Sequence, residues 1–171
     1  MIRSRVVLGV AIWLATGVAS AQVAAPSPTP LPPLAKGDAV PGFEAEGLDG
    51  VKRVVDYPKG GSTVLLFFLS SCPTCHKMIP LWNSAFERRP KGLTVWGVML
   101  DQEPPGFFVV TPVSFPVLRA PAVTPEARRA FSDRFRISRV PVTLRVSPGG
   151  RVEDVGLGPL DPIRLGELFR P

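Results

Sequence analysis

An α/β fold, with a sheet covered by helices on both faces, is predicted by three features of this sequence. Two strongly apolar runs, 63–69 (TVLLFFL) and 93–100 (LTVWGVML), are typical of central strands buried on both sides. Between them lies a stretch with helical spacing of apolar residues. Two later helix starts, Thr124-Pro125 and Asp161-Pro162, place a capping side chain before a proline at the first helical position. This alternation of strands and helices predicts one α/β domain.

The first half of the domain is predicted to contain a hairpin, a buried strand, a helix and a second buried strand. Asp49-Gly50 is a hairpin-type turn between the alternating stretches 43–50 and 51–57. The helix follows the strand 63–69 and ends before Gly92, where arginines and a lysine gather. Its buried face is expected to consist of Met78, Ile79, Leu81, Trp82, Ala85 and Phe86.

The second half is predicted to contain a short strand, a helix, a hairpin and a closing helix. A loop rich in proline and glycine spans 101–111, and a short strand is expected at 115–118. The hairpin pairs 140–146 with 151–155 through the turn 147–150. The inward residues of the two helices are expected to be Ala127, Ala130, Phe131 and Phe135 in the first, and Ile163, Leu165, Leu168 and Phe169 in the second.

The N-terminal segment 1–21 is predicted to be a signal peptide. Arg3 and Arg5 precede an apolar run of 14 residues, 6–19, and Ala19-Ser20-Ala21 matches a small-residue cleavage site. The run is shorter than the roughly 20 residues that a membrane-spanning helix needs, although a retained membrane anchor is the alternative. The proline-rich segment 22–34 is expected to be an extended linker, followed by one domain at 35–171.

The basic charge of the chain is attributed to a solvated surface. The formal net charge is +6, and loss of Arg3 and Arg5 with the signal would lower it to +4. Because the protein is predicted to be exported to the periplasm, nucleic acid is not expected as a partner. The domain is expected to be a monomer.

Both cysteines lie in the run Ser-Ser-Cys-Pro-Thr-Cys-His at 70–76, where a buried strand gives way to a helix. Pro73 suits the first helical position. A thiol at Cys72 therefore meets unpaired N–H groups and the positive end of the helix dipole, which stabilise a thiolate. Cys75 is one turn away and can close a disulfide with it. A purely structural bridge is disfavoured because it would close almost no loop, so the pattern predicts redox chemistry.

These elements resemble the thioredoxin superfamily, and most closely its exported TlpA/ResA-type branch. The resemblance covers nearly all of the chain from residue 35. It rests on the lead-in 36–43 (KGDAVPGF), the Cys-Pro-Thr-Cys motif after a buried strand, Pro80, Val140-Pro141 before an apolar strand, and the hairpin 147–152. It implies a thioredoxin-like fold: a central mixed sheet, helices on both faces and an N-terminal hairpin extension. A shorter similarity, confined to six residues, links Ser-Ser-Cys-Pro-Thr-Cys to the thioredoxin-like accessory protein of methylamine utilisation.

The resemblance also implies roles for six residues. Cys72 attacks the partner and Cys75 resolves the mixed disulfide. Pro73 and Thr74 tune the redox potential. The groove that receives the partner's cysteine segment is shaped by Val140 and Pro141, whose peptide bond is expected to be cis.

Two departures from the family pattern concern the surroundings of the cysteines. Ser71 stands where the family commonly has tryptophan, so the surface beside the disulfide is more polar. Leu66 stands where thioredoxins carry a buried acid, the usual proton acceptor of the second thiol. Glu44 and Glu46 are candidates to replace that acid.

The predicted function is an exported thiol–disulfide oxidoreductase that needs no cofactor or metal and acts more as a reductant than as an oxidant. The expected partners are cysteine-containing exported proteins and a membrane redox partner, with cytochrome c or metalloprotein assembly as the setting. Two alternatives stay open. Cys72-x-x-Cys75-His76 is also the attachment pattern of a c-type haem, and the domain could be a non-catalytic thioredoxin-like binding module.

Overall fold

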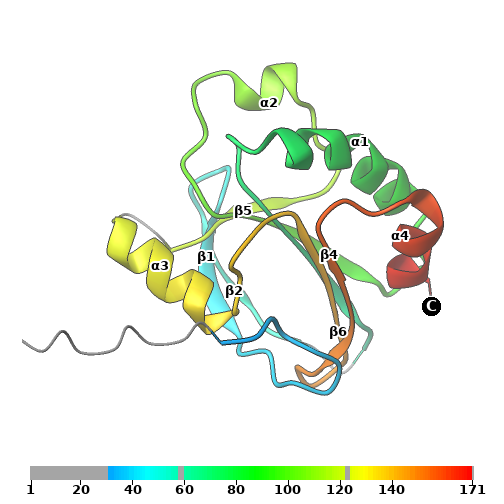
Figure 1. The fold of residues 1–171 in the computed structure, drawn as a ribbon. Helices are drawn as coiled ribbons and strands as arrows, with labels where there is room; N and C mark the ends of the chain where they lie inside the picture. The colour runs from blue at the N-terminus through cyan, green and yellow to red at the C-terminus, as the bar shows by residue number, and fades with distance from the viewer. Residues whose placement is uncertain (1–30, 58–59, 122–123, 171) are drawn as a thin grey trace, which may run out of the picture.

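A seven-stranded mixed sheet forms the centre of the computed structural model, which describes residues 31–57, 60–121 and 124–170 (Figure 1). The order across the sheet is β2-β1-β5-β4-β3-β6-β7. β4 pairs in parallel with β3 and β5, and all other neighbouring strands are antiparallel. The strands are β1 (Phe43–Gly47), β2 (Lys52–Val55), β3 (Thr63–Phe68), β4 (Thr94–Met99), β5 (Val117–Arg119), β6 (Val142–Val146) and β7 (Val152–Leu157).

Helices cover both faces of this sheet, as the sequence predicts. α1 (Pro73–Glu87), α2 (Phe107–Val110) and α4 (Pro162–Phe169) lie on one face, and α3 (Pro125–Arg134) lies on the other (Figure 1). The predicted α/β, thioredoxin-like architecture with its N-terminal hairpin, β1–β2, is confirmed.

The three longer helices begin in the same way. Each has proline at its start and a preceding side chain that accepts a hydrogen bond from the first turn. Thr124 Oγ1 accepts from the amide of Ala127 at 3.2 Å, and Asp161 Oδ1 accepts from that of Arg164 at 2.8 Å. In α1 the capping group is the sulfur of Cys72. Local chemistry alone therefore places all three helix starts.

The central strand β3 connects the two halves of the core. All six of its residues are buried, and successive side chains point to opposite faces. Phe67 contacts Phe135 on the α3 side at a ring-centroid distance of 5.4 Å. Phe68 lies against Trp82 of α1 on the other side, at 6.2 Å. The strand that carries the cysteine motif is thus held from both faces.

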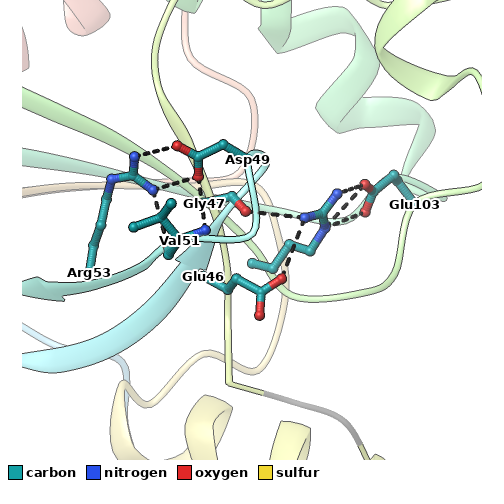
Figure 2. A network of polar contacts seen from close by, with 7 residues as sticks. Glu46, Gly47, Asp49, Val51, Arg53 and Glu103 are labelled. Atoms are coloured by element: carbon teal, nitrogen blue, oxygen red, sulfur yellow. Dashed lines mark hydrogen bonds and ion pairs between the residues drawn. The ribbon is translucent and has the colours of Figure 1, made fainter.

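Arg119, the last residue of β5, ties the N-terminal hairpin to the loop that follows β4. Its guanidinium donates to the carboxylate of Glu103 and to the carbonyl of Gly47, the latter at 3.2 Å (Figure 2). Glu46 approaches the same guanidinium at 4.0 Å. At the tip of the hairpin, Arg53 pairs with Asp49 (Figure 2). The loop that carries Glu103 is therefore anchored to the sheet through β5.

Three of the structural expectations from the sequence are wrong. The predicted loop 101–111 contains the short helix α2, in which Phe107 is buried against the α1 side of the core. Ile163 is 81% exposed, because it lies two residues before Leu165 and so points to the opposite side of α4. Ala130 is exposed, since the inward stripe of α3 consists of Phe131 and the residues four positions away from it.

The predicted signal peptide 1–21 and the linker up to residue 30 lie outside the described residues. Leu34, at the end of the predicted linker, is buried in the core. Within the described residues, none of the helices combines the length and the apolar character that crossing a membrane requires.

We expect Phe135→Ala to lower the free energy of unfolding by about 3–5 kcal/mol, because it leaves a cavity among aromatic rings. Ile163→Ala is the control, and its exposed side chain should make a difference below about 0.5 kcal/mol. Chemical denaturation of the two variants gives both values. Equal losses would contradict this description of the core.

Candidate active site

The two cysteines occupy the point where β3 leaves the sheet and α1 begins. After Phe68 the chain turns through Ser70 and Ser71, and Cys72 takes the N-cap position with an extended backbone. The amide of Cys72 donates to the carbonyl of Leu69 at 3.2 Å. Cys72 is half-buried and Cys75 is completely buried. One thiol of the pair is therefore accessible to a partner and the other is not.

The helix start stabilises negative charge on the outer sulfur. The amide of Cys75 donates to Cys72 Sγ at 3.2 Å. This amide is one of the N–H groups that have no acceptor within the helix, and the helix dipole adds to its effect. The first turn of α1 contains no acidic residue to oppose that effect. The arrangement suits Cys72 as the attacking thiolate.

The inner thiol has the opposite environment. Burial raises the pKa of Cys75 to about 12, and the hydrogen bond with Cys72, the charge of Cys72 and the charge of Asp101 act in the same direction. Cys75 therefore stays protonated at neutral pH. The two thiols thus differ in exposure and in protonation, as is required of an attacking and a resolving thiol.

The other predicted site residues surround this pair. Pro73 is exposed at the first position of α1, and Thr74 is half-buried. The Val140–Pro141 peptide bond is cis. Pro141 is buried, and Val140 packs against the core cluster that contains Cys75 and that Cys72 borders. The structure thus brings all six predicted residues to one end of the sheet.

The acid that the structure places near the cysteines is Asp101. Leu66 is completely buried, as its position in β3 requires. Glu44 and Glu46, the candidates to replace the buried acid, are exposed on β1. Asp101 instead binds the turn that precedes Cys72. Sequence reasoning missed it, although it follows a buried strand that is parallel to the cysteine strand, and the carboxyl ends of such strands share one edge.

The c-type haem alternative does not fit these residues. Thioether attachment needs both sulfur atoms at the edge of the ring, whereas Cys75 is completely buried. The Nε2 atom of His76 lies 2.6 Å from the carbonyl oxygen of Ser70. The ring centroids of His76 and Phe107 are 5.6 Å apart. The histidine is thus occupied in fixing the start of α1. In the described part of the chain, no three His, Cys, Asp or Glu residues cluster as metal ligands would.

Comparison with known proteins identifies the family. The structure of MTB dsbF, in mixed oxidized and reduced forms, is 30% identical to this chain, covers 74% of it and 92% of its own length, and has a TM-score of 0.60. The chain belongs to the thioredoxin superfamily. Within it, the TlpA/ResA-type resemblance is confirmed.

Two further thioredoxin-like structures share the fold. StoA from Bacillus subtilis is 22% identical, with 77% of this chain and 98% of that chain covered and a TM-score of 0.62. The thioredoxin domain of a thiol-disulfide oxidoreductase from Bacteroides vulgatus is 21% identical, with 80% and 98% covered and a TM-score of 0.65. No protein-family model and no curated protein sequence matches the chain.

We expect iodoacetamide at neutral pH to label Cys72 of the reduced protein and to leave Cys75 unmodified, because Cys75 is buried and protonated. Peptide mapping by mass spectrometry identifies the labelled site. As a control, Cys72→Ser should resist labelling until denaturant is added. Labelling of Cys75 before Cys72 in the native protein would show that the assignment is reversed.

Proposed function

We propose that this protein is an exported thiol–disulfide oxidoreductase that reduces disulfides in other exported proteins through Cys72 and Cys75. The observation that carries the proposal is the asymmetry of the pair: a half-buried sulfur at a helix N-cap beside a buried, protonated thiol. Pro73 and Thr74 lie between the cysteines and tune the redox potential. Val140 packs against the core cluster that contains Cys75. In this proposal Val140 and Pro141 shape the groove that receives the partner's cysteine segment.

The exchange proceeds in two steps that balance. The thiolate of Cys72 attacks one sulfur of the partner's disulfide, forms a mixed disulfide and releases the other sulfur of the partner as a thiolate, which takes up a proton. Cys75 then loses its proton and attacks Cys72 Sγ, which releases the second sulfur of the partner. Two electrons pass to the partner, and the Cys72–Cys75 disulfide remains. A second redox partner, held at the membrane, reduces that disulfide again.

An extracytoplasmic location is supported by the N-terminal sequence and by one similar structure. The basic residues, short apolar run and small-residue site of segment 1–21 have the pattern of an export signal. A structure with 17% identity and a TM-score of 0.58 is that of a secreted Mycobacterium tuberculosis disulfide oxidoreductase. The proline-rich segment after the signal suits a domain that must reach a membrane partner.

The reducing direction is supported by the negative charge beside the cysteine pair and by the family resemblance. A dithiol becomes a strong oxidant when its reduced form is stabilised. The start of α1 favours a thiolate at Cys72, whereas the carboxylate of Asp101, bound to the turn before Cys72, opposes one. Together with the TlpA/ResA-type resemblance, this favours a reductant whose clients need free cysteines, such as apocytochrome c or a metalloprotein under assembly.

We expect Cys75→Ser to accumulate mixed disulfides with client proteins, because no thiol remains to release them. Non-reducing electrophoresis followed by mass spectrometry identifies the clients. Cys72→Ser, which lacks the attacking sulfur, is the matched control and should accumulate none. If the double Cys→Ser variant retained the same partners as wild type, a non-catalytic binding module would be the better account.

In the cells that produce the protein, we expect the Cys72–Cys75 pair to be mostly reduced at steady state. Acid quenching followed by alkylation with a mass tag separates the dithiol from the disulfide. A disulfide donor would instead be found mostly oxidised. If the pair were mostly oxidised and mixed disulfides still formed, the protein would be a thiol–disulfide exchanger that donates disulfides instead of reducing them.

A further inference from the structure

The carboxylate of Asp101 accepts four hydrogen bonds from the two serines that precede Cys72. Its Oδ1 atom accepts from the amide of Ser70 at 2.7 Å. Its Oδ2 atom accepts from the hydroxyl of Ser70 at 2.9 Å, from the hydroxyl of Ser71 at 3.2 Å and from the amide of Ser71 at 3.3 Å. One side chain thus binds both amides and both hydroxyls of the turn that leads into the attacking cysteine.

The fold delivers Asp101 to this turn through the parallel pairing of β3 with β4. The register pairs Phe68 with Met99, and the amide of Leu100 donates to the carbonyl of Phe68 at 2.9 Å. The next residue is Asp101. Beyond this point the two strands are no longer paired, and the carboxylate of Asp101 accepts hydrogen bonds from the amides of Ser70 and Ser71. Two residues further, Glu103 is held by Arg119, so the segment is anchored on both sides of Asp101 (Figure 2).

The same turn is held from the helix side. The Nε2 atom of His76 in α1 lies 2.6 Å from the carbonyl oxygen of Ser70. Ser70 is 5% exposed, whereas Ser71 and His76 are exposed, so the contacts of the turn are shielded from water on the Ser70 side only. Ser71, which stands where the family commonly has tryptophan, contributes one of the four bonds to Asp101 through its hydroxyl.

Asp101 also places a negative charge beside the cysteine pair. It lines a groove of about 580 Å³ with Glu44, Glu46, Lys52, Arg119 and Arg128, so its carboxylate borders solvent. Burial is the main cause of the raised pKa of Cys75, and the charge of Asp101 adds a smaller contribution in the same direction. An anion at this place disfavours a second anion on either sulfur, but it has no such effect on the uncharged disulfide.

We propose that Asp101 is a positioning residue of the exchange reaction: it holds the turn before Cys72, and its charge shifts the Cys72–Cys75 pair toward the disulfide. It therefore makes the dithiol a stronger reductant. This inference rests on the proposed function, because it concerns the same cysteine pair. Leu66 leaves β3 without the buried acid of thioredoxins, and the acid that acts on the cysteine pair in this proposal is Asp101, from the segment that follows β4.

The test compares equilibrium constants of Asp101→Asn and wild type in glutathione buffers at pH 8. The substitution removes the charge and keeps a side-chain oxygen for the Ser70 amide. We expect the reduced form of the variant to be favoured about tenfold more than in wild type, a shift of about 30 mV toward a weaker reductant. Glu44→Gln removes an equal charge from the same groove without touching the turn, and it should change the constant less than twofold.

Two further variants keep the test decisive. Asp101→Glu restores the charge, so its constant should return to within about threefold of wild type. If circular dichroism shows that Asp101→Asn does not fold, Asp101→Ser makes the same charge change with a smaller side chain that can still accept a hydrogen bond. An unchanged constant in the folded neutral variant, or an equal shift in Glu44→Gln, would overturn the role of Asp101.

A failure of this test can be distinguished from a failure of the proposed reducing direction. The role of Asp101 depends on the ratio between variant and wild type, whereas the reducing direction depends on the absolute potential of wild type. A wild-type protein that is an oxidant could still show the tenfold ratio, and a reductant could lack it.

Discussion

The parallel pairing of β3 with β4 is the constraint on which the site depends. Because both strands run in the same direction, their carboxyl ends meet at one edge of the sheet. Cys72 follows one strand and Asp101 follows the other, and the two segments are joined by the hydrogen bonds of Ser70 and Ser71. A shift of this register by two residues would carry Asp101 away from the turn. The chemistry of the cysteines is therefore tied to the core that fixes the register.

The asymmetry of the two thiols follows from the same geometry. A strand that is buried on both faces must leave the sheet before the chain can reach solvent, so the first residue of the new helix lies at the surface. The residue one turn later points back into the core, in the same buried cluster as Met78 and Phe68. Cys72 and Cys75 occupy these two positions. Their spacing of three residues thus separates an accessible sulfur from a protected one and orders the two steps of exchange.

Much of this was predictable because it depends on local chemistry. A capping side chain followed by proline marks a helix start whatever surrounds it, and Cys72-Pro73, Thr124-Pro125 and Asp161-Pro162 all begin helices. The continuous apolar run of β3 likewise shows that both faces of the strand are covered. The cis bond before Pro141 came from the family resemblance rather than from the residues themselves.

What the sequence could not show depends on contacts between distant segments. The short helix α2 depends on the burial of Phe107 against the α1 side of the core, and the sequence of its four residues does not predict this contact. Asp101 lies in a stretch rich in acids and prolines, and it gains its significance only when the register places it against Ser70, 31 residues earlier. The distance of Glu44 and Glu46 from the cysteines likewise depends on the order of the strands in the sheet, which their own sequence does not reveal.

The measurement that tests the central claim most directly is the equilibrium potential of the wild-type Cys72–Cys75 pair against glutathione. A reversible two-electron exchange with a potential below about −200 mV is expected of a reductant. A potential near the strong-oxidant value of about −120 mV would contradict the claim and make the protein a disulfide donor.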